Sequence, residues 1–302
     1  MEWLGRLRAE VRTEAPLGEH TSYRIGGPAE ALVTPHNMEA LKEILSRGHA
    51  DKIPVRIIGG GTNLLVSDRG VRGIVITLGR GFDGIRILSR TSEGALVRAG
   101  AGARLSDILL RAAEGDLGGV EYLAGVPGTL GGALIMNAGT ATEFIGDAVV
   151  SVDVIDGEGK FWLVPGKDIE FGYRKTAFPV IGALVGAILR FRDRPRKEVM
   201  ADIRSRVRQR RDTQPLSSPS AGSVFKNPKG AFGAAELIER TGLKGLRVGG
   251  AEVSAVHANF IINRAGATAT DVEALIRAIQ KQVDDLAGER LELEIHWVGE
   301  AP

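Results

Sequence analysis

The sequence predicts an α+β or α/β protein with two lobes, and three observations indicate this. The chain has 302 residues, more than the roughly 100–200 residues of most single domains. Segments with helical and with strand periodicity alternate along the chain, which is typical of mixed architectures. The character of the sequence changes near Asp193-Arg194-Pro195. We therefore expect one domain at residues 1–195, with a split into two subdomains near 75–80, and a second domain at 196–302.

The first half of the chain predicts two helices and several short strands. Asn37 can cap a helix that ends at Gly48, because Leu41, Ile44 and Leu45 share one face. The other elements expected here are strands at residues 54–58, 64–66, 73–76, 151–155 and 182–191, a helix at 105–115 and a glycine-rich connection at 118–139.

The second half predicts three helices. The clearest one spans Thr270 to Ala287, where Thr270 and Glu273 form a capping box and Gly288 ends the helix. Its apolar stripe consists of Val272, Leu275, Ile276, Ile279, Val283 and Leu286. The other helices are expected at residues 197–211 and 234–241, with a Pro/Ser stretch at 214–220 after the first of them.

The composition excludes several classes of function. Cys is absent, so disulfides, thiolate metal sites and thiol redox chemistry are impossible. The net charge of +2 gives no general reason to bind nucleic acid or membrane. No uncharged apolar run reaches the ~18 residues of a membrane-spanning helix, and the N-terminus lacks the apolar region of a signal peptide. We therefore expect a cytoplasmic protein with no metal, nucleic-acid or membrane partner.

Two glycine clusters carry the strongest local signal. Residues 57–63 (Ile-Ile-Gly-Gly-Gly-Thr-Asn) predict a strand that ends in a loop whose N–H groups can cradle a phosphate. The loop is neither a Walker loop nor the dinucleotide fingerprint, because no Gly-Lys-Ser/Thr follows and Leu64 occupies the third glycine position. On its own it fits a tight turn equally well. A second cluster at residues 123–139 favours a dinucleotide with an extended pyrophosphate over a packing crossover.

Six segments, taken in order, resemble the motifs of one family. They are His20–Ala29 (HTSYRIGGPA), Gly59–Asp68 (GGGTNLLVSD), Glu121–Thr129 (EYLAGVPGT), Gly172–Arg174 (GYR), Ser220–Pro228 (SAGSVFKNP) and His257–Asn263 (HANFIIN). The family that they resemble is UDP-N-acetylenolpyruvoylglucosamine reductase, an enzyme of bacterial peptidoglycan-precursor synthesis. The resemblance extends from about residue 20 to residue 299. The short stretch between Arg174 and Ser223 is similar to the compact subtype, which lacks an extra tyrosine-bearing loop.

The resemblance implies an FAD-binding domain of the vanillyl-alcohol-oxidase (PCMH) type and a smaller α/β C-terminal substrate domain. FAD would be bound non-covalently, and NADPH would be the hydride donor. The implied reaction reduces the enolpyruvyl group of UDP-N-acetylglucosamine enolpyruvate to give UDP-N-acetylmuramate. The cofactor-binding residues that it implies are Arg24, Gly59, Gly60, Gly61, Thr62, Asn63, Leu64, Gly125, Pro127, Gly128, Thr129, Gly132, Asn137, Ala138 and Gly139.

Three residues are implied to be catalytic. Hydride addition to an enolpyruvyl ether builds negative charge on the neighbouring carbon and its carboxylate, so catalysis needs charge-stabilising groups and a proton donor. By resemblance, Arg174 stabilises the charge, because a guanidinium grips a carboxylate with two parallel hydrogen bonds. Ser223 would donate the proton to carbon, with Lys226 as the positive charge that favours its alkoxide.

Glu294 is implied as the third catalytic residue. Residues 291–297 alternate apolar and polar side chains, so we expect a closing strand whose polar face carries Glu292, Glu294 and His296. Glu292 is the alternative carboxylate. Considered without the resemblance, Arg174 fits a surface arginine, Ser223 a loop serine and Glu294 a solvated edge strand better than a catalytic role.

Substrate contacts are expected from the same segments. The residues implied are Tyr173, Lys226 and Asn227, with Gln214, His257 and Asn259 as weaker candidates for the same wall. The arginine-rich helix at 197–211 also fits nucleic-acid binding, but neighbouring acidic residues and the small net charge favour a solvated face. Two other functions stay open, an oxidase with the same flavin fold and a non-catalytic flavin or sugar-nucleotide binding protein. We expect a monomer or a weak homodimer.

Overall fold

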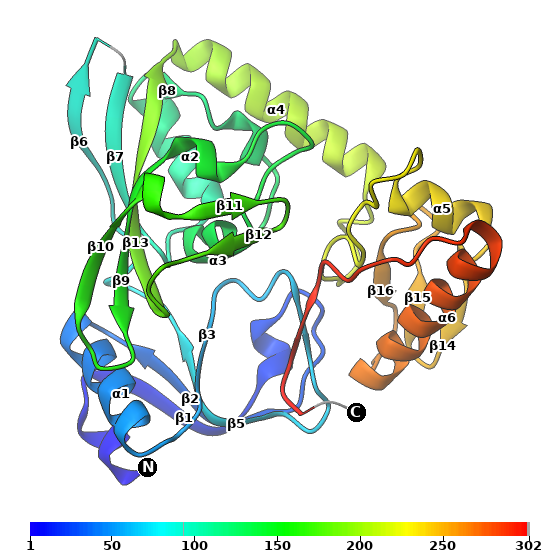
Figure 1. Cartoon of the computed structure of the whole chain (residues 1–302), viewed down its shortest axis with the longest axis horizontal. Helices are drawn as coiled ribbons and strands as arrows, with labels where there is room; N and C mark the ends of the chain where they lie inside the picture. Colours follow the sequence, from blue (N-terminus) through cyan, green and yellow to red (C-terminus); the bar gives the residue numbers. More distant parts are fainter. Residues whose placement is uncertain (93, 301–302) are drawn as a thin grey trace. The chain divides into compact units, whose positions relative to one another are not determined.

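The structure is a computed structural model that describes residues 1–92 and 94–300. It divides into two compact units, whose elements are labelled in Figure 1. Unit 1 consists of Met1–Thr13, Ala31–Gly60 and Gly73–Gln209, and unit 2 consists of Glu14–Glu30, Gly61–Arg72 and Arg210–Pro302. The predicted domains are continuous in sequence, whereas these units interleave. The predicted boundary near residue 195 therefore stays a prediction.

A four-stranded sheet and one helix form the N-terminal part of the fold. The strands, in spatial order, are β1 (Ala9–Pro16), β2 (Pro28–Pro35), β5 (Val71–Thr77) and β3 (Val55–Ile58). Helix α1 (Met38–Ala50) begins at Asn37, whose side chain accepts a hydrogen bond from the Ala40 N–H group, as the sequence predicts. The predicted end at Gly48 is wrong by two residues. A Cβ on Gly48 would lie 2.5 Å from the Val55 side chain, so this glycine allows close packing and does not stop the helix.

A larger antiparallel sheet forms the centre of unit 1. Its strands, in spatial order, are β10 (Phe161–Pro165), β9 (Val149–Asp156), β13 (Gly182–Asp193), β7 (Gly94–Gly100) and β6 (Ile85–Thr91), and β8 (Leu117–Gly118) also pairs with β13. Helices α2 (Leu105–Glu114) and α3 (Leu130–Ile135) pack on it and share its hydrophobic core (Figure 1). Helix α2 is the helix predicted at 105–115, with Leu105 and Ile108 buried.

The expected connection at residues 118–139 contains regular structure, which corrects the sequence prediction. The 3₁₀ turn η3 (Glu121–Leu123) and helix α3 lie within it. Glycine disfavours helix, but Leu130 and Leu134 are fully buried and stabilise α3 by packing. Beyond it lie the hairpin β11 (Glu170–Gly172) and β12 (Lys175–Ala177) and the long helix α4 (Arg196–Thr213). The other 3₁₀ turns are η1 (Glu2–Arg6), η2 (Leu17–His20), η4 (Ile145–Ala148) and η5 (Gly166–Asp168).

Unit 2 combines two helices with two small sheets. Helix α5 (Ala234–Arg240) and helix α6 (Ala269–Ala287) pack with the antiparallel sheet of β14 (Arg247–Val248), β15 (Ala251–Val253) and β16 (Ile261–Asn263). Strand β4 (Leu64–Val66) pairs in parallel with β17 (His296–Val298). Among residues 1–92 and 94–300, no helix is both long and apolar enough to cross a membrane.

Three predictions in unit 2 need correction. The capping box of α6 is Thr268 with Asp271, not Thr270 with Glu273, so the helix begins one residue earlier. Leu286 is 59% exposed, whereas the rest of the predicted stripe is buried, and Gly288 ends the helix in the left-handed conformation as predicted. The closing strand is shorter than predicted, since only His296–Val298 is strand and Leu293 is exposed.

Candidate active site

The two glycine clusters meet within unit 1. Gly59 follows β3, and Thr129 precedes α3. A Cβ on Gly59 would lie 2.6 Å from the Thr129 hydroxyl oxygen and 3.8 Å from the Gly132 nitrogen. Gly59 and Gly132 are exposed, so side-chain-free backbone faces outward where the clusters meet.

Thr129 adds a polar atom to this glycine cradle. Its hydroxyl oxygen is buried and has no hydrogen-bond partner in the part of the chain that the structure describes. Buried polar atoms are nearly always paired in folded proteins, so an orphaned one calls for an explanation such as a ligand. A cradle without side chains, with a hydroxyl beside it, fits a phosphate-bearing group such as the pyrophosphate of FAD.

The end of the first glycine loop belongs to unit 2 and is packed tightly there. Gly61 has a φ of 62°, and a Cβ on it would lie 2.0 Å from the His20 carbonyl oxygen, so only glycine fits. The Ser22 N–H group donates to the Gly61 carbonyl oxygen at 3.1 Å. Arg24, in the same segment, is exposed and has a φ of 56°. Gly61 therefore holds the segment of residues 20–24 against the loop.

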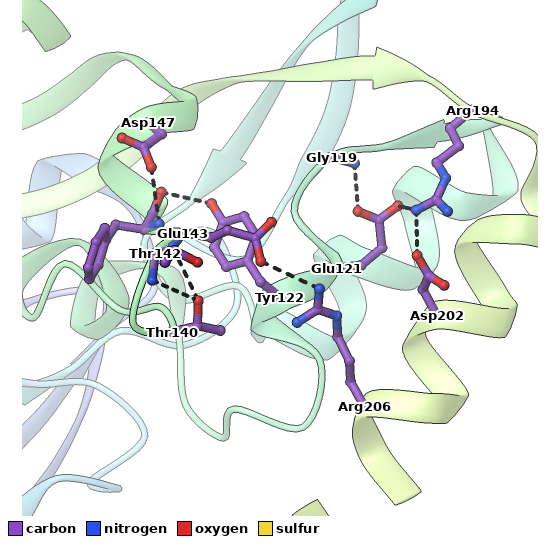
Figure 2. Close-up of polar contacts among 11 residues, drawn as sticks. Gly119, Glu121, Tyr122, Thr140, Thr142, Glu143, Asp147, Arg194, Asp202 and Arg206 are labelled. Atoms are coloured by element: carbon purple, nitrogen blue, oxygen red, sulfur yellow. Dashed lines mark hydrogen bonds and ion pairs between the residues drawn. The ribbon is translucent and has the colours of Figure 1, made fainter. Parts of the chain in front are cut away.

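Polar contacts hold the chain just before and just after the second glycine cluster (Figure 2). The Glu121 carboxylate is buried and accepts hydrogen bonds from the Gly119 N–H group at 2.7 Å and from Arg194 at 2.9 Å. Arg194 also pairs with Asp202 of α4 at 2.7 Å. The hydrogen bonds that Arg194 donates to these two carboxylates, the one to Asp202 first, raise its pKa. The Tyr122 hydroxyl donates to the Phe144 carbonyl oxygen at 2.9 Å, so residues on the two sides of the cluster contact each other.

Arg174 lies in the turn of the β11–β12 hairpin. Its φ of 54° places a non-glycine residue in the left-handed region, which costs about 1–2 kcal/mol. Its guanidinium carbon lies 5.0 Å from the centre of the Tyr173 ring. Asn137 also has a positive φ of 42°, and its buried side chain donates to the Gly172 carbonyl oxygen at 3.0 Å. Strained residues of this kind cluster at functional sites.

In unit 2 the structure brings the Ser223 and Glu294 segments together. The Glu294 N–H group donates to the Val224 carbonyl oxygen at 2.8 Å, and the Lys226 N–H group donates to the Glu292 carbonyl oxygen at 2.9 Å. The two segments are therefore antiparallel neighbours. Glu294 is half-buried, whereas the Glu292 side chain is 78% exposed.

Two asparagines hold this pair of segments in place. The Asn259 side chain is buried, accepts a hydrogen bond from the Phe225 N–H group at 2.9 Å and donates to the Phe225 carbonyl oxygen at 2.8 Å. The Asn63 side chain donates to the Glu294 carbonyl oxygen at 3.0 Å, and the Asn63 carbonyl oxygen accepts from the His296 N–H group at 2.9 Å. Asn63 therefore links the end of the glycine loop to the Glu294 segment.

The remaining predicted substrate residues also lie in unit 2. Lys226 pairs with Glu292 at 3.2 Å, and Asn227 accepts a hydrogen bond from the Ala234 N–H group at the start of α5. Gln214 is half-buried. His257 packs edge-on against the Phe260 ring, and its Nδ1 atom is buried with no hydrogen-bond partner among the described residues. Burial, followed by the nearby Lys244 charge, lowers the pKa of His257.

Sequence reasoning missed three residues that hold the site. They are Glu121, Thr176 and Asp68, whose partners lie far away in the sequence. Asp68 accepts hydrogen bonds from the N–H groups of Ala269 and Thr270, 201 and 202 residues later, at the start of α6. An acidic residue after a glycine motif is no signal by itself, because the helix that it caps is remote in sequence.

The fold and the glycine cradle define an FAD-binding protein with an additional C-terminal domain. Residues 29–164 match the family described as FAD binding domain, which confirms FAD as the predicted cofactor. Residues 214–298 match the C-terminal domain of UDP-N-acetylenolpyruvoylglucosamine reductase. These two matches confirm the predicted fold class.

Whole-chain comparisons give the family. A UDP-N-acetylenolpyruvoylglucosamine reductase from Moorella thermoacetica is 43% identical over 97% of this chain and 95% of that protein. One from Desulfosudis oleivorans is 40% identical over 99% of this chain and 98% of that protein. The crystal structure of the corresponding reductase from Thermus caldophilus superposes with a TM-score of 0.80 at 37% identity, covering 97% of this chain and 99% of that one. The chain belongs to the UDP-N-acetylenolpyruvoylglucosamine reductase family.

Proposed function

We propose that this protein reduces the enolpyruvyl group of UDP-N-acetylglucosamine enolpyruvate to give UDP-N-acetylmuramate, using NADPH and FAD, in the synthesis of peptidoglycan precursor. The observation that carries this proposal is the pairing of the Ser223 and Glu294 segments in unit 2. Both segments lie within residues 214–298, which match the C-terminal domain of the reductase family. The reaction adds hydride to the terminal carbon of the double bond and a proton to the neighbouring carbon.

Each predicted catalytic residue has one task in this reaction. FAD, when bound, supplies the hydride, because no side chain can carry one. The Arg174 guanidinium holds the substrate carboxylate and stabilises the charge that builds on it. Ser223 donates the proton from its hydroxyl to carbon, and Glu294, on the neighbouring segment, holds or passes the proton that Ser223 must regain.

Lys226 is the group that makes Ser223 a usable acid in this proposal. A serine hydroxyl is a weak acid, and nearby positive charge favours its ionised form. Lys226 lies three residues after Ser223 and forms an ion pair with the exposed Glu292. Asn259 fixes Phe225, which lies between them, through both main-chain groups. We infer that Asn259 acts by holding this segment, while Lys226 and Asn227 remain the candidates for substrate phosphate or sugar.

We assign FAD binding first to Gly59, Thr129 and Gly132, because their geometry supports it. The other predicted cofactor residues are assigned by their place in the same two loops. Two of them have side chains engaged with protein, since Asn137 bonds Gly172 and Asn63 bonds Glu294. In our proposal these two asparagines shape the site and offer only their main chain to the cofactor.

We also propose that the protein is cytoplasmic and acts as a monomer or a weak homodimer on a small, soluble substrate. A sugar nucleotide carrying a diphosphate is made and used in the cytoplasm, and the chain has no cysteine to benefit from an oxidising compartment. Size-exclusion chromatography with light scattering at two protein concentrations tests the oligomeric state.

An anaerobic spectroscopic experiment tests the proposed function. Purified holoenzyme is reduced with one equivalent of NADPH, and UDP-N-acetylglucosamine enolpyruvate is then added while the flavin absorption is followed. We expect the oxidised flavin band to recover within seconds. Recovery only after oxygen is admitted would favour an oxidase, and a protein that NADPH cannot reduce would favour a binding function.

A further inference from the structure

The hairpin that carries Arg174 is attached to the second glycine cluster at two points. Asn137 donates a side-chain hydrogen bond to the Gly172 carbonyl oxygen at 3.0 Å, before the turn. The Thr176 hydroxyl donates to the Leu134 carbonyl oxygen at 2.6 Å, after the turn. Both strands of the hairpin are therefore fixed to the end of α3, and the turn with Arg174 lies between the two attachments.

The backbone of the turn explains why such attachments are needed. Gly172 and Lys175 are paired across the hairpin, so Tyr173 and Arg174 form a two-residue turn. Arg174 has a φ of 54°, a backbone conformation that residues other than glycine rarely adopt. A strained turn persists only when its surroundings over-determine it. Loss of one attachment would let Arg174 relax toward ordinary backbone geometry and move its guanidinium.

We propose that Thr176 is a positioning residue for Arg174. Its hydroxyl holds the β12 side of the hairpin on α3 and so keeps the strained turn in place. Asn137 holds the β11 side, but it is also a predicted cofactor residue, whereas Thr176 is not and gives the cleaner test. The effect of Thr176 on turnover rests on the proposed function; its effect on the hairpin does not.

Limited trypsin digestion of the FAD-loaded protein tests the hairpin directly. Trypsin cleaves after Arg174 and Lys175, and cleavage of a folded segment requires local opening. We expect Thr176→Val to be cut at these two bonds roughly tenfold faster than wild type, with other sites unchanged, since the hydrogen bond that ties β12 to α3 is lost. Thr176→Ser should behave like wild type. Equal cleavage in Thr176→Val, or faster cleavage at every site, would overturn the proposal.

A matched control comes from the β6–β7 hairpin. The Thr91 hydroxyl donates to the Gly94 carbonyl oxygen at 3.3 Å, and no predicted site residue lies in that hairpin. Thr91→Val removes the same kind of bond and should leave cleavage after Arg174 unchanged. Faster cleavage there in both variants would show that any lost hydroxyl loosens the fold and would count against a specific role for Thr176.

Half-reaction kinetics test the catalytic consequence. In Thr176→Val we expect FAD content and the rate of flavin reduction by NADPH to stay within about twofold of wild type. Flavin reoxidation by the enolpyruvyl substrate should slow by roughly 10- to 100-fold, the cost of a misplaced catalytic group, and Thr176→Ser should restore it. If wild type itself fails to use the substrate, the proposed function fails, and the trypsin result alone decides on Thr176. Reoxidation at the wild-type rate in Thr176→Val would contradict the positioning role.

Discussion

Ser223 and Glu294 are the residues on which the proposed chemistry depends most. Their segments are joined by the hydrogen bond from the Glu294 N–H group to the Val224 carbonyl oxygen. Asn259 and Asn63 each anchor one of the two segments through a side-chain amide. A proton donor to carbon needs a fixed position more than a low pKa, because proton transfer demands contact with the accepting atom. The asparagines supply that rigidity.

Replacement of Ser223 by Ala separates the two half-reactions. NADPH should still reduce the flavin at the wild-type rate, whereas reoxidation by the enolpyruvyl substrate should slow by roughly 10²- to 10⁴-fold, the usual contribution of a general acid. Stopped-flow absorption of the flavin measures both rates. Ser218→Ala, in the Pro/Ser stretch that precedes Ser223, is the control and should retain both. Unimpaired reoxidation in Ser223→Ala would remove this serine from the mechanism.

The choice between Glu294 and Glu292 is a second prediction at the residue scale. Glu292 is 78% exposed and pairs with Lys226 at the surface, and an exposed ion pair is worth about 1 kcal/mol at most. Glu292→Gln should therefore change turnover by less than about fivefold. Glu294→Gln should lower it by roughly 10²-fold or more. Steady-state turnover of the two variants decides between them, and the reverse order would reassign the third catalytic residue to Glu292.

At the scale of elements, Asp68 connects the loop after β4 to helix α6. Its two carboxylate oxygens accept hydrogen bonds from the N–H groups of Ala269 at 2.8 Å and Thr270 at 3.0 Å. N–H groups in the first turn of a helix have no partner inside the helix. The charge also opposes the positive end of the helix dipole. Asp68 therefore acts as a cap for a helix that begins about 200 residues later.

Removal of this cap should destabilise the protein measurably. We expect Asp68→Ala to lower the free energy of unfolding by about 1 kcal/mol, within the usual range for a lost helix cap. Asp68→Asn keeps one acceptor oxygen and should lose less. Urea unfolding followed by circular dichroism gives both values. If Asp68→Ala unfolds at the same midpoint as wild type, the cap contributes nothing to stability.

Elements were predictable where their signal was local. The stripe of α6 is correct up to Val283 because each buried residue follows from helical spacing alone. Helix α3 was missed because its glycines disfavour a helix and its stability comes from burial of Leu130 and Leu134 in the sheet. The closing strand was overextended because alternation alone cannot show where a partner ends, and β4 offers only Leu64–Val66 for pairing.

For the whole molecule, two histidines, the half-buried His257 and the more exposed His296, predict a loss of stability in mild acid. Partial loss of hydration, followed by a nearby lysine charge, lowers the pKa of both His257 and His296 in the folded state. Below the unfolded value of about 6.5, the unfolded chain binds protons that the folded chain does not, so folding becomes less favourable as the pH falls. The melting temperature should drop between pH 7 and pH 5, and less so in His257→Asn. An identical drop in that variant would mean that His257 contributes nothing to this pH dependence.

The site as a whole was only partly predictable from the sequence. The glycine clusters and the motifs around Ser223 and Arg174 are short and contiguous, so the resemblance located them. The residues that hold them lie far away in sequence: Asn63 bonds Glu294 across 231 positions, and Glu121 bonds Arg194 across 73. Neither partner has a distinctive local pattern. Only the folded chain reveals these contacts.

The central claim is that this chain reduces a carbon–carbon double bond of a sugar nucleotide. The most direct measurement is product identification after anaerobic incubation of the holoenzyme with NADPH and UDP-N-acetylglucosamine enolpyruvate. We predict one product per NADPH consumed, heavier by two hydrogens in its mass spectrum, with the vinyl proton signals replaced by those of a lactyl methyl group. An unchanged enolpyruvyl compound, with NADPH consumed only when oxygen is present, would contradict the account.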